Sequence, residues 1–234
     1  LEVSEYRKVR TILCGTEVIL SAGTIGSPQL LMLSGIGPAK NLKENGIQVI
    51  LHLPGVGRNL QDHLQVRPIY RCKSGTLNSH LGNPAKLVWH LLNYVFTRKG
   101  LLSMGAGVGA GFIRSNRQLN RPDLQFFVQP FSLDLQTLKP HPFDALTMAV
   151  YQLRPSSRGE IRLASNDFEK QPEILPNYLS EEIDQNVLLS GIKIANELAT
   201  ISPLKDLITG AYETPQVEAS SEKELLEWIK ATAV

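Results

Sequence analysis

The stretch "EVILSAGTIGSPQLLMLSGIG", residues 17–37, places two apolar runs on either side of a group of small residues. Residues 18–20 are Val-Ile-Leu, which favours a buried strand, and they are followed directly by Ser21-Ala22-Gly23. Ser27 is a good helix N-cap, and Pro28 suits the first helical position, where its missing N–H is harmless. The spacing therefore predicts a strand, a turn of small residues and a helix.

The turn of small residues has two possible uses. A turn without large side chains lets the backbone approach a ligand closely, and the following helix offers the positive end of its dipole. Small residues also let a helix pack tightly against a sheet. Taken alone, the turn Ser21-Ala22-Gly23 leaves both uses open.

The composition describes a globular chain without special partners. The chain has 234 residues, 42% hydrophobic and 20% charged, which allows one large domain or two small ones. A net charge of +2 and the lack of a long basic block give no reason to expect nucleic acid. Cys14 and Cys72 form no CxxC pattern, so we expect unpaired thiols, no zinc site and a reducing compartment. No apolar run reaches the ~18 residues that span a bilayer.

The two ends of the sequence are abrupt. The first residues read like the inside of a strand, with no Met and no signal peptide before them. Residues 222–234 read as a helix with nothing after it. We expect an internal piece of a longer protein; a mature chain with processed ends is the alternative.

Further along, the periodicity predicts a mixed set of elements. Strands are expected at residues 47–51, 66–70, 124–128, 148–153 and 160–163, and a loop at 53–64. Helices are expected at residues 38–44, 83–94, from Ser180 onward, and after Ser221, which forms a capping box with Glu224. Long connections between the later strands favour an antiparallel sheet with helices on one side, an α+β arrangement.

Several segments together resemble one known family. Residues 21–37 resemble the second signature of the glucose–methanol–choline (GMC) family of flavin oxidoreductases. The segments "LPGVGRNLQDH" at 53–63, "PSSRG" at 155–159 and "PEILPNYL" at 172–179 are also similar to family segments, in the family order. The resemblance covers nearly the whole chain.

The resemblance implies a fold, a cofactor and a reaction. Residues 1–63 would be part of a doubly wound FAD-binding α/β domain, and residues 64–234 a substrate domain with an antiparallel sheet backed by helices. Family members oxidise alcohols by passing a hydride to FAD. The cofactor would lie beside the turn and the loop at the domain junction, against Ser21, Ala22, Gly23, Ser27, Asn59, Asp62 and His63.

Two features of the family have no match here. The Gly-x-Gly-x-x-Gly fingerprint is missing; Gly105-Ala106-Gly107 follows a helix, so we interpret it as a flexible or pocket-lining loop. The family's catalytic His lies after a helix resembling residues 221–231, so we expect no catalytic residue in this chain and a His beyond Val234. His63 is the best candidate base present, although a His in a polar loop more often holds the loop by a hydrogen bond.

The substrate pocket would be formed by strand side chains that face the flavin. Aromatic and amide side chains suit an alcohol, and the candidates are Tyr70, Phe127, Gln129 and Phe131, with Gln125 and Tyr151 as further ones. Ordinary sheet packing is the alternative for each. Since only 6% of the chain is aromatic, an uncharged aliphatic or aromatic alcohol is favoured over a choline-type cation.

Three functions remain open at this stage. The first is part of an FAD-dependent alcohol dehydrogenase or oxidase, inactive as this fragment alone. The second is a substrate-domain module without flavin and without catalysis. The third is a cyanohydrin lyase, because some relatives keep FAD only as a structural group. The expected localisation is cytoplasmic or peripherally membrane-associated, with a small molecule as partner.

Overall fold

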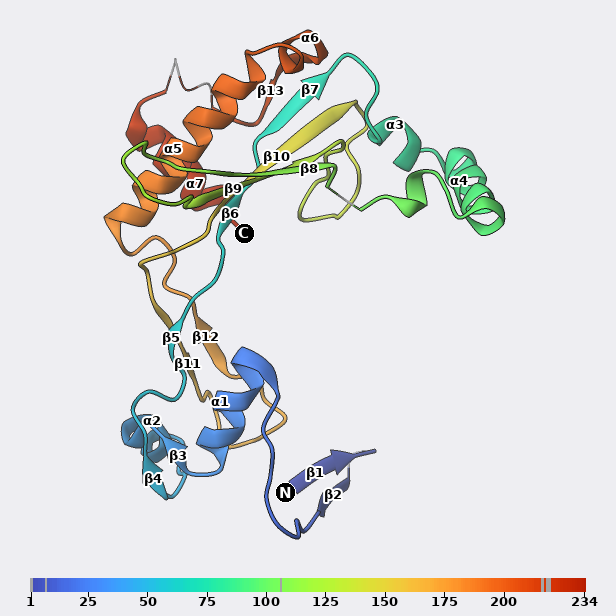
Figure 1. The fold of residues 1–234 in the computed structure, drawn as a ribbon. Helices are drawn as coiled ribbons and strands as arrows, with labels where there is room; N and C mark the ends of the chain where they lie inside the picture. The colour runs from blue at the N-terminus through green and yellow to red at the C-terminus, as the bar shows by residue number, and fades with distance from the viewer. Residues whose placement is uncertain (1, 7, 106, 216, 218–219) are drawn as a thin grey trace. The chain divides into compact units, whose positions relative to one another are not determined.

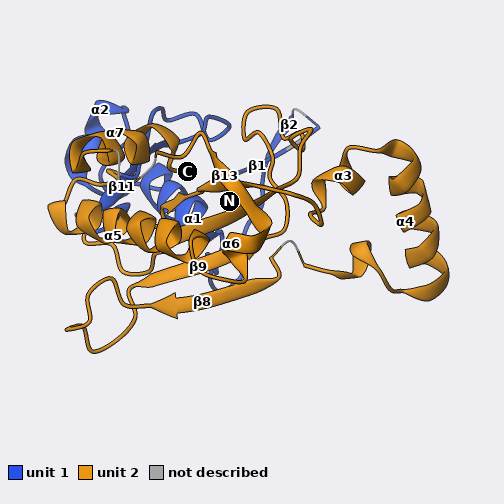
Figure 2. Ribbon diagram, turned by 90° about the horizontal axis from the view of Figure 1, so that it is seen from above, with its two compact units in different colours: residues 1–60, 158–176 blue, residues 61–157, 177–234 orange. Residues whose placement is uncertain are grey.

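The computed structural model describes residues 2–6, 8–105, 107–215, 217 and 220–234. The chain forms two compact units, which Figure 2 shows in different colours: residues 1–60 with 158–176, and residues 61–157 with 177–234. A single boundary after residue 63 does not describe this division, because residues 158–176 return to unit 1. Residues 158–176 contain two strands that share one sheet with the strand beginning at Arg58, and this pairing places them in unit 1.

Unit 1 begins with a hairpin. Strands β1 (Glu2–Glu5) and β2 (Lys8–Thr11) pair antiparallel, with Glu5 opposite Lys8. Residues 15–16 form a bend, and the run at 18–20 forms no strand. Its three apolar side chains are exposed, Ile19 by 80%. The strand prediction was wrong because an extended run becomes a strand only where a partner completes its hydrogen bonds.

Helix α1 (Gly23–Leu33) starts a turn earlier than the sequence predicts. Ala22 is the N-cap, and Pro28 lies inside the helix. Ser27 is therefore not the cap; its Oγ accepts a hydrogen bond from the Ala22 N–H at 3.0 Å. The hydroxyl thus satisfies a backbone donor just before the helix. An N-cap acts from the residue before the helix, whereas Ser27 acts from inside it.

A second helix and a short parallel pair follow. Helix α2 (Ala39–Glu44) confirms the helix expected at 38–44 and ends at Asn45-Gly46, with Gly46 in the left-handed region. The strand expected at 47–51 reduces to β4 (Leu51–His52), which pairs in parallel with β3 (Ile36–Gly37). Within the described part of unit 1 this is the one parallel pairing.

The sheet of unit 1 joins distant parts of the sequence. Strands β5 (Arg58–Leu60), β11 (Gly159–Arg162) and β12 (Glu173–Leu175) pair antiparallel in the order β12-β11-β5. The loop predicted at 53–64 therefore contains a strand. Met32 and Leu42 from the two helices pack against Ile161 and Leu163 to form a small core.

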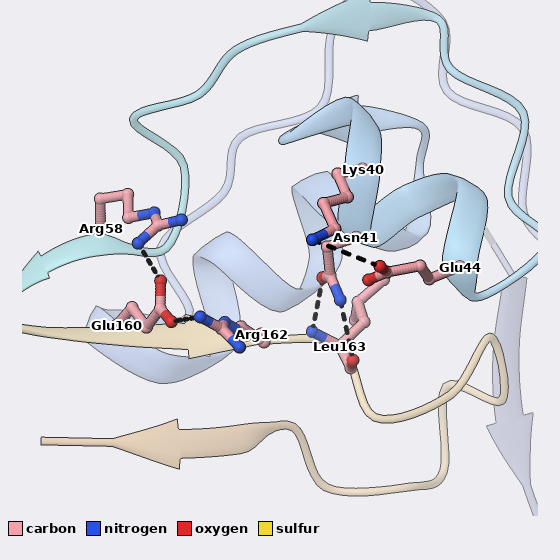
Figure 3. Close-up of polar contacts among 7 residues, drawn as sticks. All are labelled: Lys40, Asn41, Glu44, Arg58, Glu160, Arg162 and Leu163. Carbon is pink, nitrogen blue, oxygen red and sulfur yellow. Dashed lines mark hydrogen bonds and ion pairs between the residues drawn. The ribbon is translucent and has the colours of Figure 1, made fainter.

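Side-chain contacts stabilise this sheet in addition to its backbone hydrogen bonds. Glu160 forms ion pairs with Arg58 on one side and Arg162 on the other (Figure 3). Asn41 of α2 accepts from the Leu163 N–H at 2.9 Å and donates to the Leu163 carbonyl at 3.2 Å, as a neighbouring strand would. The amide thereby ties α2 to the end of β11.

Unit 2 is built on an antiparallel sheet. Its order is β13-β7-β10-β9-β8, with β6 also paired to β10. The strands are β6 (Gln65–Val66), β7 (Ile69–Cys72), β8 (Gly109–Ile113), β9 (Leu124–Gln129), β10 (Ala145–Gln152) and β13 (Ile208–Tyr212). The strand expected at 66–70 is split at Arg67-Pro68, since Pro68 lacks the N–H that a ladder needs.

Helices cover one face of this sheet, as the sequence predicts. Helix α5 (Glu182–Ala199) lies along the sheet and α7 (Glu222–Thr232) packs beside it (Figure 1). Leu146, Met148 and Val150 of β10 meet Leu188 and Ile192 of α5 in the main core. The fold is therefore α+β, with an antiparallel sheet backed by helices.

Four further helical pieces belong to unit 2. Helices α3 (Asn78–Leu81) and α4 (Pro84–Thr97) and the 3₁₀ turn η1 (Leu101–Ser103) follow β7, and α6 (Leu204–Leu207) follows α5. Helix α4 is the amphipathic helix predicted at 83–94. Asn83 caps it by accepting from the Lys86 N–H.

We expect Ser221→Ala to lower the free energy of unfolding of unit 2 by about 1 kcal/mol. The Ser221 Oγ accepts from the Glu224 N–H at 3.3 Å, and the Glu224 carboxylate accepts from the Ser221 N–H at 2.7 Å. Chemical denaturation followed by circular dichroism measures the change. Ser220→Ala removes a neighbouring hydroxyl outside the cap and should have almost no effect; equal losses in the two variants would contradict the capping role.

Candidate functional site

The turn that opens α1 is accessible and poor in side chains. Ser21, Ala22 and Gly23 are all exposed, and Ser27 reaches back to the Ala22 N–H. Gly23 has φ +75°, and a Cβ built on it would meet no atom within 4 Å. Four of the seven predicted cofactor residues, Ser21, Ala22, Gly23 and Ser27, thus lie together at the start of α1.

The surroundings of this turn suit a flat aromatic group. Val18, Ile19, Leu20 and Ile25 expose between 38% and 80% of their surfaces beside it. The first N–H groups of a helix have no partner within the helix, and α1 carries no acidic residue in its first turn. Backbone donors, open space and exposed apolar side chains are the kinds of group that a flavin nucleotide contacts, and the cofactor role of this turn stays a prediction.

Asn59 holds the strand β5 in the sheet of unit 1. Its side-chain oxygen accepts from Arg158 Nε at 2.8 Å, and its backbone is left-handed at φ +62°. Asn tolerates this conformation better than most residues. The hydrogen bond links the segment 53–63 to the turn at 155–159, two of the segments that carry the family resemblance.

Asp62 and His63 fix a loop of unit 2. The Asp62 carboxylate accepts from the Tyr178 hydroxyl at 2.7 Å and from the His63 N–H at 2.7 Å. His63 Nε2 lies 3.2 Å from the carbonyl oxygen of Leu153. Both side chains thus have local partners. The cofactor role predicted for Asn59, Asp62 and His63 stays a prediction.

Asp62→Asn should lower the pKa of Tyr178. Burial of the phenol and its hydrogen bond to the Asp62 carboxylate raise the pKa of Tyr178 to about 12. A raised folded pKa stabilises the fold below the unfolded value of about 10, and this stabilisation fades as the pH rises toward 12. Difference absorbance of tyrosinate, against Tyr178→Phe, measures the shift. Glu173→Gln is the matched control, and an unchanged Tyr178 titration in Asp62→Asn would contradict the assignment.

The face of the unit 2 sheet that the helices leave open carries polar and aromatic side chains. Strand register places Phe127 opposite Ala149, and Gln129 opposite Thr147, on the face away from Leu146 and Met148. The alternation along strands puts Gln125 and Tyr151 on this open face too, with Phe131 just beyond the end of β9. The structure therefore gathers the predicted pocket residues of β9 on one face.

Tyr70 belongs to the opposite face. It pairs with Leu146, and only 2% of its surface is exposed. Its hydroxyl has no hydrogen-bond partner among the described residues, and burial raises the pKa of its phenol. Tyr70 also lines a cavity of about 510 Å³ on the helix side, together with Lys193 and Asn196 of α5. Tyr70 therefore lies on the opposite face of the sheet from Phe127 and Gln129.

A cavity of about 440 Å³ opens on the face that carries Gln129. Its wall includes residues that the sequence did not single out. Arg67 donates to Gln129 Oε1 at 2.7 Å, and burial lowers the pKa of this guanidinium. His141 stacks on Phe143 at 5.1 Å between ring centroids, and Tyr212 packs edge-on to His141. The lining groups also include Thr147 and Trp228.

The loop that carries His141 is held by one buried amide. Asn78, 3% exposed, donates to the carbonyls of Ser132 and His141 and accepts from the Ser132 N–H. The Ser132 hydroxyl lies 2.9 Å from His141 Nδ1. The place of His141 in the cavity depends on a contact with Asn78, 63 residues away in the sequence. No local pattern could have shown it.

Asp184 is a second residue that the sequence did not single out. Its carboxylate is 1% exposed and accepts from Gln152 Nε2 and from the N–H groups of Ser156 and Ser157 at 2.6–2.8 Å. Burial alone would raise its pKa, but these donors, together with the Ser157 hydroxyl, hold the pKa below the ordinary value. Asp184 therefore fixes the "PSSRG" segment, which leads from unit 2 into β11.

The other histidines and the glycine segment at 105–107 also make local contacts. His52 Nδ1 accepts from the Ala39 N–H, and His80 Nδ1 lies 3.0 Å from His90 Nε2. In the glycine segment, Gly107 lies against the Phe127 ring, while Ala106 is outside the described residues. Among residues that the structure describes, no group of three His, Cys, Asp or Glu could hold a metal ion. In the same residues, no helix has the length and apolar character needed to cross a bilayer.

Comparison with known proteins matches most of this chain to one family. Residues 1–65 and 155–234 match the amino-terminal and carboxy-terminal domains of the family described as GMC oxidoreductase. Oxygen-dependent choline dehydrogenases of Staphylococcus saprophyticus and Staphylococcus xylosus are each 36% identical over 214 residues, 92% of this chain. The chain spans only 38% of the length of these relatives.

Solved structures agree in fold. A formate oxidase from Aspergillus oryzae superposes with a TM-score of 0.85 at 28% identity, over 93% of this chain and 43% of that one. A fungal aryl-alcohol oxidase superposes with a TM-score of 0.75 at 20% identity, over 97% of this chain and 45% of that one, which shows likeness of fold alone. Sequence segments, family domains and fold agree, and the chain belongs to the GMC oxidoreductase family.

Proposed function

We propose that the chain is part of an FAD-dependent oxidoreductase that oxidises the CH–OH group of a small alcohol. The observation that carries this proposal is the match of both family domains in order. The family match and the formate oxidase, whose FAD modification has been studied structurally, support FAD as the cofactor. The fragment alone is expected to be inactive.

We assign the cofactor role to residues 1–63 and the substrate role to residues 64–234. The Ser21-Ala22-Gly23 turn would hold the flavin nucleotide through backbone N–H groups, with exposed Ile19 and Ile25 offering apolar contact. Bound there, FAD would supply the hydride acceptor for oxidation of the alcohol carbon to a carbonyl. The hydroxyl proton needs a base, and we expect it from a His beyond Val234.

The cavity on the open face is the proposed substrate pocket. Thr147 and Thr214 offer hydrogen-bonding groups, and the rings of Tyr212 and Trp228 form part of the wall, whereas the predicted residues Phe127, Gln129 and Phe131 do not line it. Arg67 is bound by the uncharged Gln129, and its charge has no ion pair among the described residues. The wall also holds the carboxylates of Asp134 and Glu213. We keep the uncharged alcohol that the low aromatic content of the chain favours, and the comparison with choline below decides between the two.

Anaerobic reduction of the flavin tests this function. The full-length protein is mixed with benzyl alcohol, butanol or choline, and the flavin absorbance is followed. Bleaching by an alcohol with formation of its aldehyde is the expected result, fastest with the uncharged alcohols. Release of cyanide from a cyanohydrin without bleaching would replace the proposal by the lyase. A full-length protein that is colourless and refuses added FAD would favour the non-catalytic module.

The localisation expected from sequence, cytoplasmic or peripherally membrane-associated, also stays a proposal. Of these two, peripheral association has a physical feature to support it, a helix in unit 2 with uncovered apolar side chains.

A further inference from the structure

Arg67 brings a positive charge to the wall of the open-face cavity. It lines this cavity together with Thr147 of β10. Its guanidinium donates to Gln129 Oε1 at 2.7 Å, and Gln129 lies opposite Thr147 in the sheet. The amide of Gln129 therefore holds the guanidinium beside this cross-strand pair, at the edge of the space proposed for the substrate.

The charge of Arg67 is partly buried and has no anionic partner in the part of the chain that the structure describes. The ion pairs found there involve other side chains, and the carboxylates of Asp134 and Glu213 in the same wall form none with it. Removing a charge from water without a partner costs free energy. Its one hydrogen bond goes to an uncharged amide, so most of its N–H groups remain for a ligand.

Many other donors of this wall already serve the backbone. Four of them give their protons to carbonyl oxygens at 2.7–3.2 Å: Thr147 Oγ1, Thr214 Oγ1, Thr232 Oγ1 and Trp228 Nε1. The three hydroxyls can still accept a hydrogen bond from a substrate, but none of the four groups is free to donate one. Among the described lining residues, Arg67 is the donor that stays positively charged at every physiological pH.

We propose that Arg67 stabilises the negative charge that develops on the substrate oxygen as the alcohol is oxidised. This inference rests on the function proposed above. In that reaction the O–H bond gives its proton to the base, the C–H bond gives a hydride to the flavin, and a carbonyl forms. Charge collects on the oxygen as its proton leaves. A cation that is already in position, in a site partly removed from water, favours that charge strongly.

A carboxylate of the substrate is the other group that the free guanidinium could receive. The two uses act on different steps. Contact with a carboxylate strengthens the binding of a hydroxy acid, whereas stabilisation of developing charge speeds the reaction of an uncharged alcohol. Because the proposed substrate is an uncharged alcohol, we assign Arg67 to the developing charge.

Anaerobic reduction of the flavin by benzyl alcohol, in the full-length protein, measures this role. Arg67→Gln should slow the reduction about a hundredfold or more. Arg67→Lys keeps the charge but loses the planar set of donors, so it should be slowed less. Arg114→Gln removes an exposed arginine of unit 2 and is the matched control. Equal rates in Arg67→Gln and the unsubstituted protein would overturn the proposal.

Equilibrium binding of benzoate and benzamide separates charge from shape. The two molecules are nearly the same size, and only benzoate carries a negative charge. In calorimetry, Arg67→Gln should weaken benzoate binding about tenfold or more and should change benzamide binding by less than about twofold. Failure of the unsubstituted protein to bind benzoate, or equal weakening of both probes, would overturn the proposal.

These measurements also separate the inference from the proposed function. If no alcohol reduces the flavin, the proposed function fails, and benzoate binding that depends on Arg67 would still support an anion-stabilising site. Faster reduction by mandelate than by benzyl alcohol, lost in Arg67→Gln, would instead assign Arg67 to a substrate carboxylate and overturn the proposal. Glutamine at position 67 can keep a hydrogen bond to Gln129, so circular dichroism and flavin content should match those of the unsubstituted protein.

Discussion

Replacing Asp184 with alanine should destabilise unit 2 by about 3 kcal/mol at neutral pH. The carboxylate is buried and accepts three hydrogen bonds, from Gln152 and from the backbone of Ser156 and Ser157. Removing it leaves these donors without their acceptor in a buried place, and each such loss is costly. Chemical denaturation of the purified protein, followed by circular dichroism, measures the change.

The same residue should give the fold an acid limit. The pKa of Asp184 is lower in the folded chain than its ordinary value, so the ionised form stabilises the fold. This contribution is complete above the unfolded pKa of about 4 and is lost as the pH falls through the lower folded value. Asp184→Asn should be less stable at pH 7 and should lose this part of the acid dependence.

Asp206→Asn is the matched control for Asp184. Asp206 lies at the surface on α6, where its carboxylate accepts from the Ser202 hydroxyl. We expect it to cost less than about 0.5 kcal/mol. An Asp184→Ala variant as stable as Asp206→Asn would show that the three hydrogen bonds do not hold the segment at 155–159.

Gly57→Ala should disrupt unit 1, with a loss of about 3 kcal/mol. Gly57 has φ +78°, which L-residues with a Cβ rarely adopt. A Cβ there would also overlap the carbonyl oxygen of Ile161, whose N–H donates to the Gly57 carbonyl at 2.6 Å. Because both groups are backbone, neither can move without opening the sheet of β5 and β11. Limited proteolysis and thermal unfolding would report the loss.

Gly55→Ala provides a comparison within the same loop. Gly55 has no atom within 4 Å of a built Cβ, and its φ is not positive. Its substitution should be neutral or slightly stabilising, since alanine reduces the freedom of the unfolded chain. Similar losses for Gly55→Ala and Gly57→Ala would show that chain stiffness, rather than the contact with Ile161, decides the effect.

The sequence alone was enough to predict the features that depend on residues a few positions apart. The capping box at Ser221, the stop at Asn45-Gly46 and the amphipathic helix α4 are all set by neighbours a few residues apart. The antiparallel sheet of unit 2, backed by helices, also agrees with the prediction. Alternation along β9 was enough to place Phe127 and Gln129 together.

Predictions from the sequence were wrong for features that depend on contacts outside the local pattern. The run at 18–20 is apolar enough for a strand but pairs with nothing in the described part of the chain. Ser27 has the residue type of an N-cap, yet its hydroxyl serves Ala22 and the helix begins at Gly23. Tyr70 was assigned to the pocket by type, while its register with Leu146 turns it to the helices.

For the candidate site, residue types were enough to predict which segments are involved. The partner of each side chain depends on tertiary contacts, which the sequence does not show. Asp62 looked like a cofactor residue, and the structure gives it Tyr178 as partner. Arg67 and His141 line the open-face cavity because β7, β10 and the loop before β10 converge there, and no spacing in the sequence encodes that.

The central claim is that a flavin lies against the Ser21-Ala22-Gly23 turn, and flavin content of Ser21→Leu tests it most directly. Ser21 is exposed, so leucine should leave the fold intact while its side chain occupies the space of the cofactor. Ser74→Leu, at an exposed bend of unit 2, is the control. We predict that the full-length protein keeps its FAD absorbance in Ser74→Leu and loses it in Ser21→Leu, with equal circular dichroism. Full flavin content in Ser21→Leu would contradict the account.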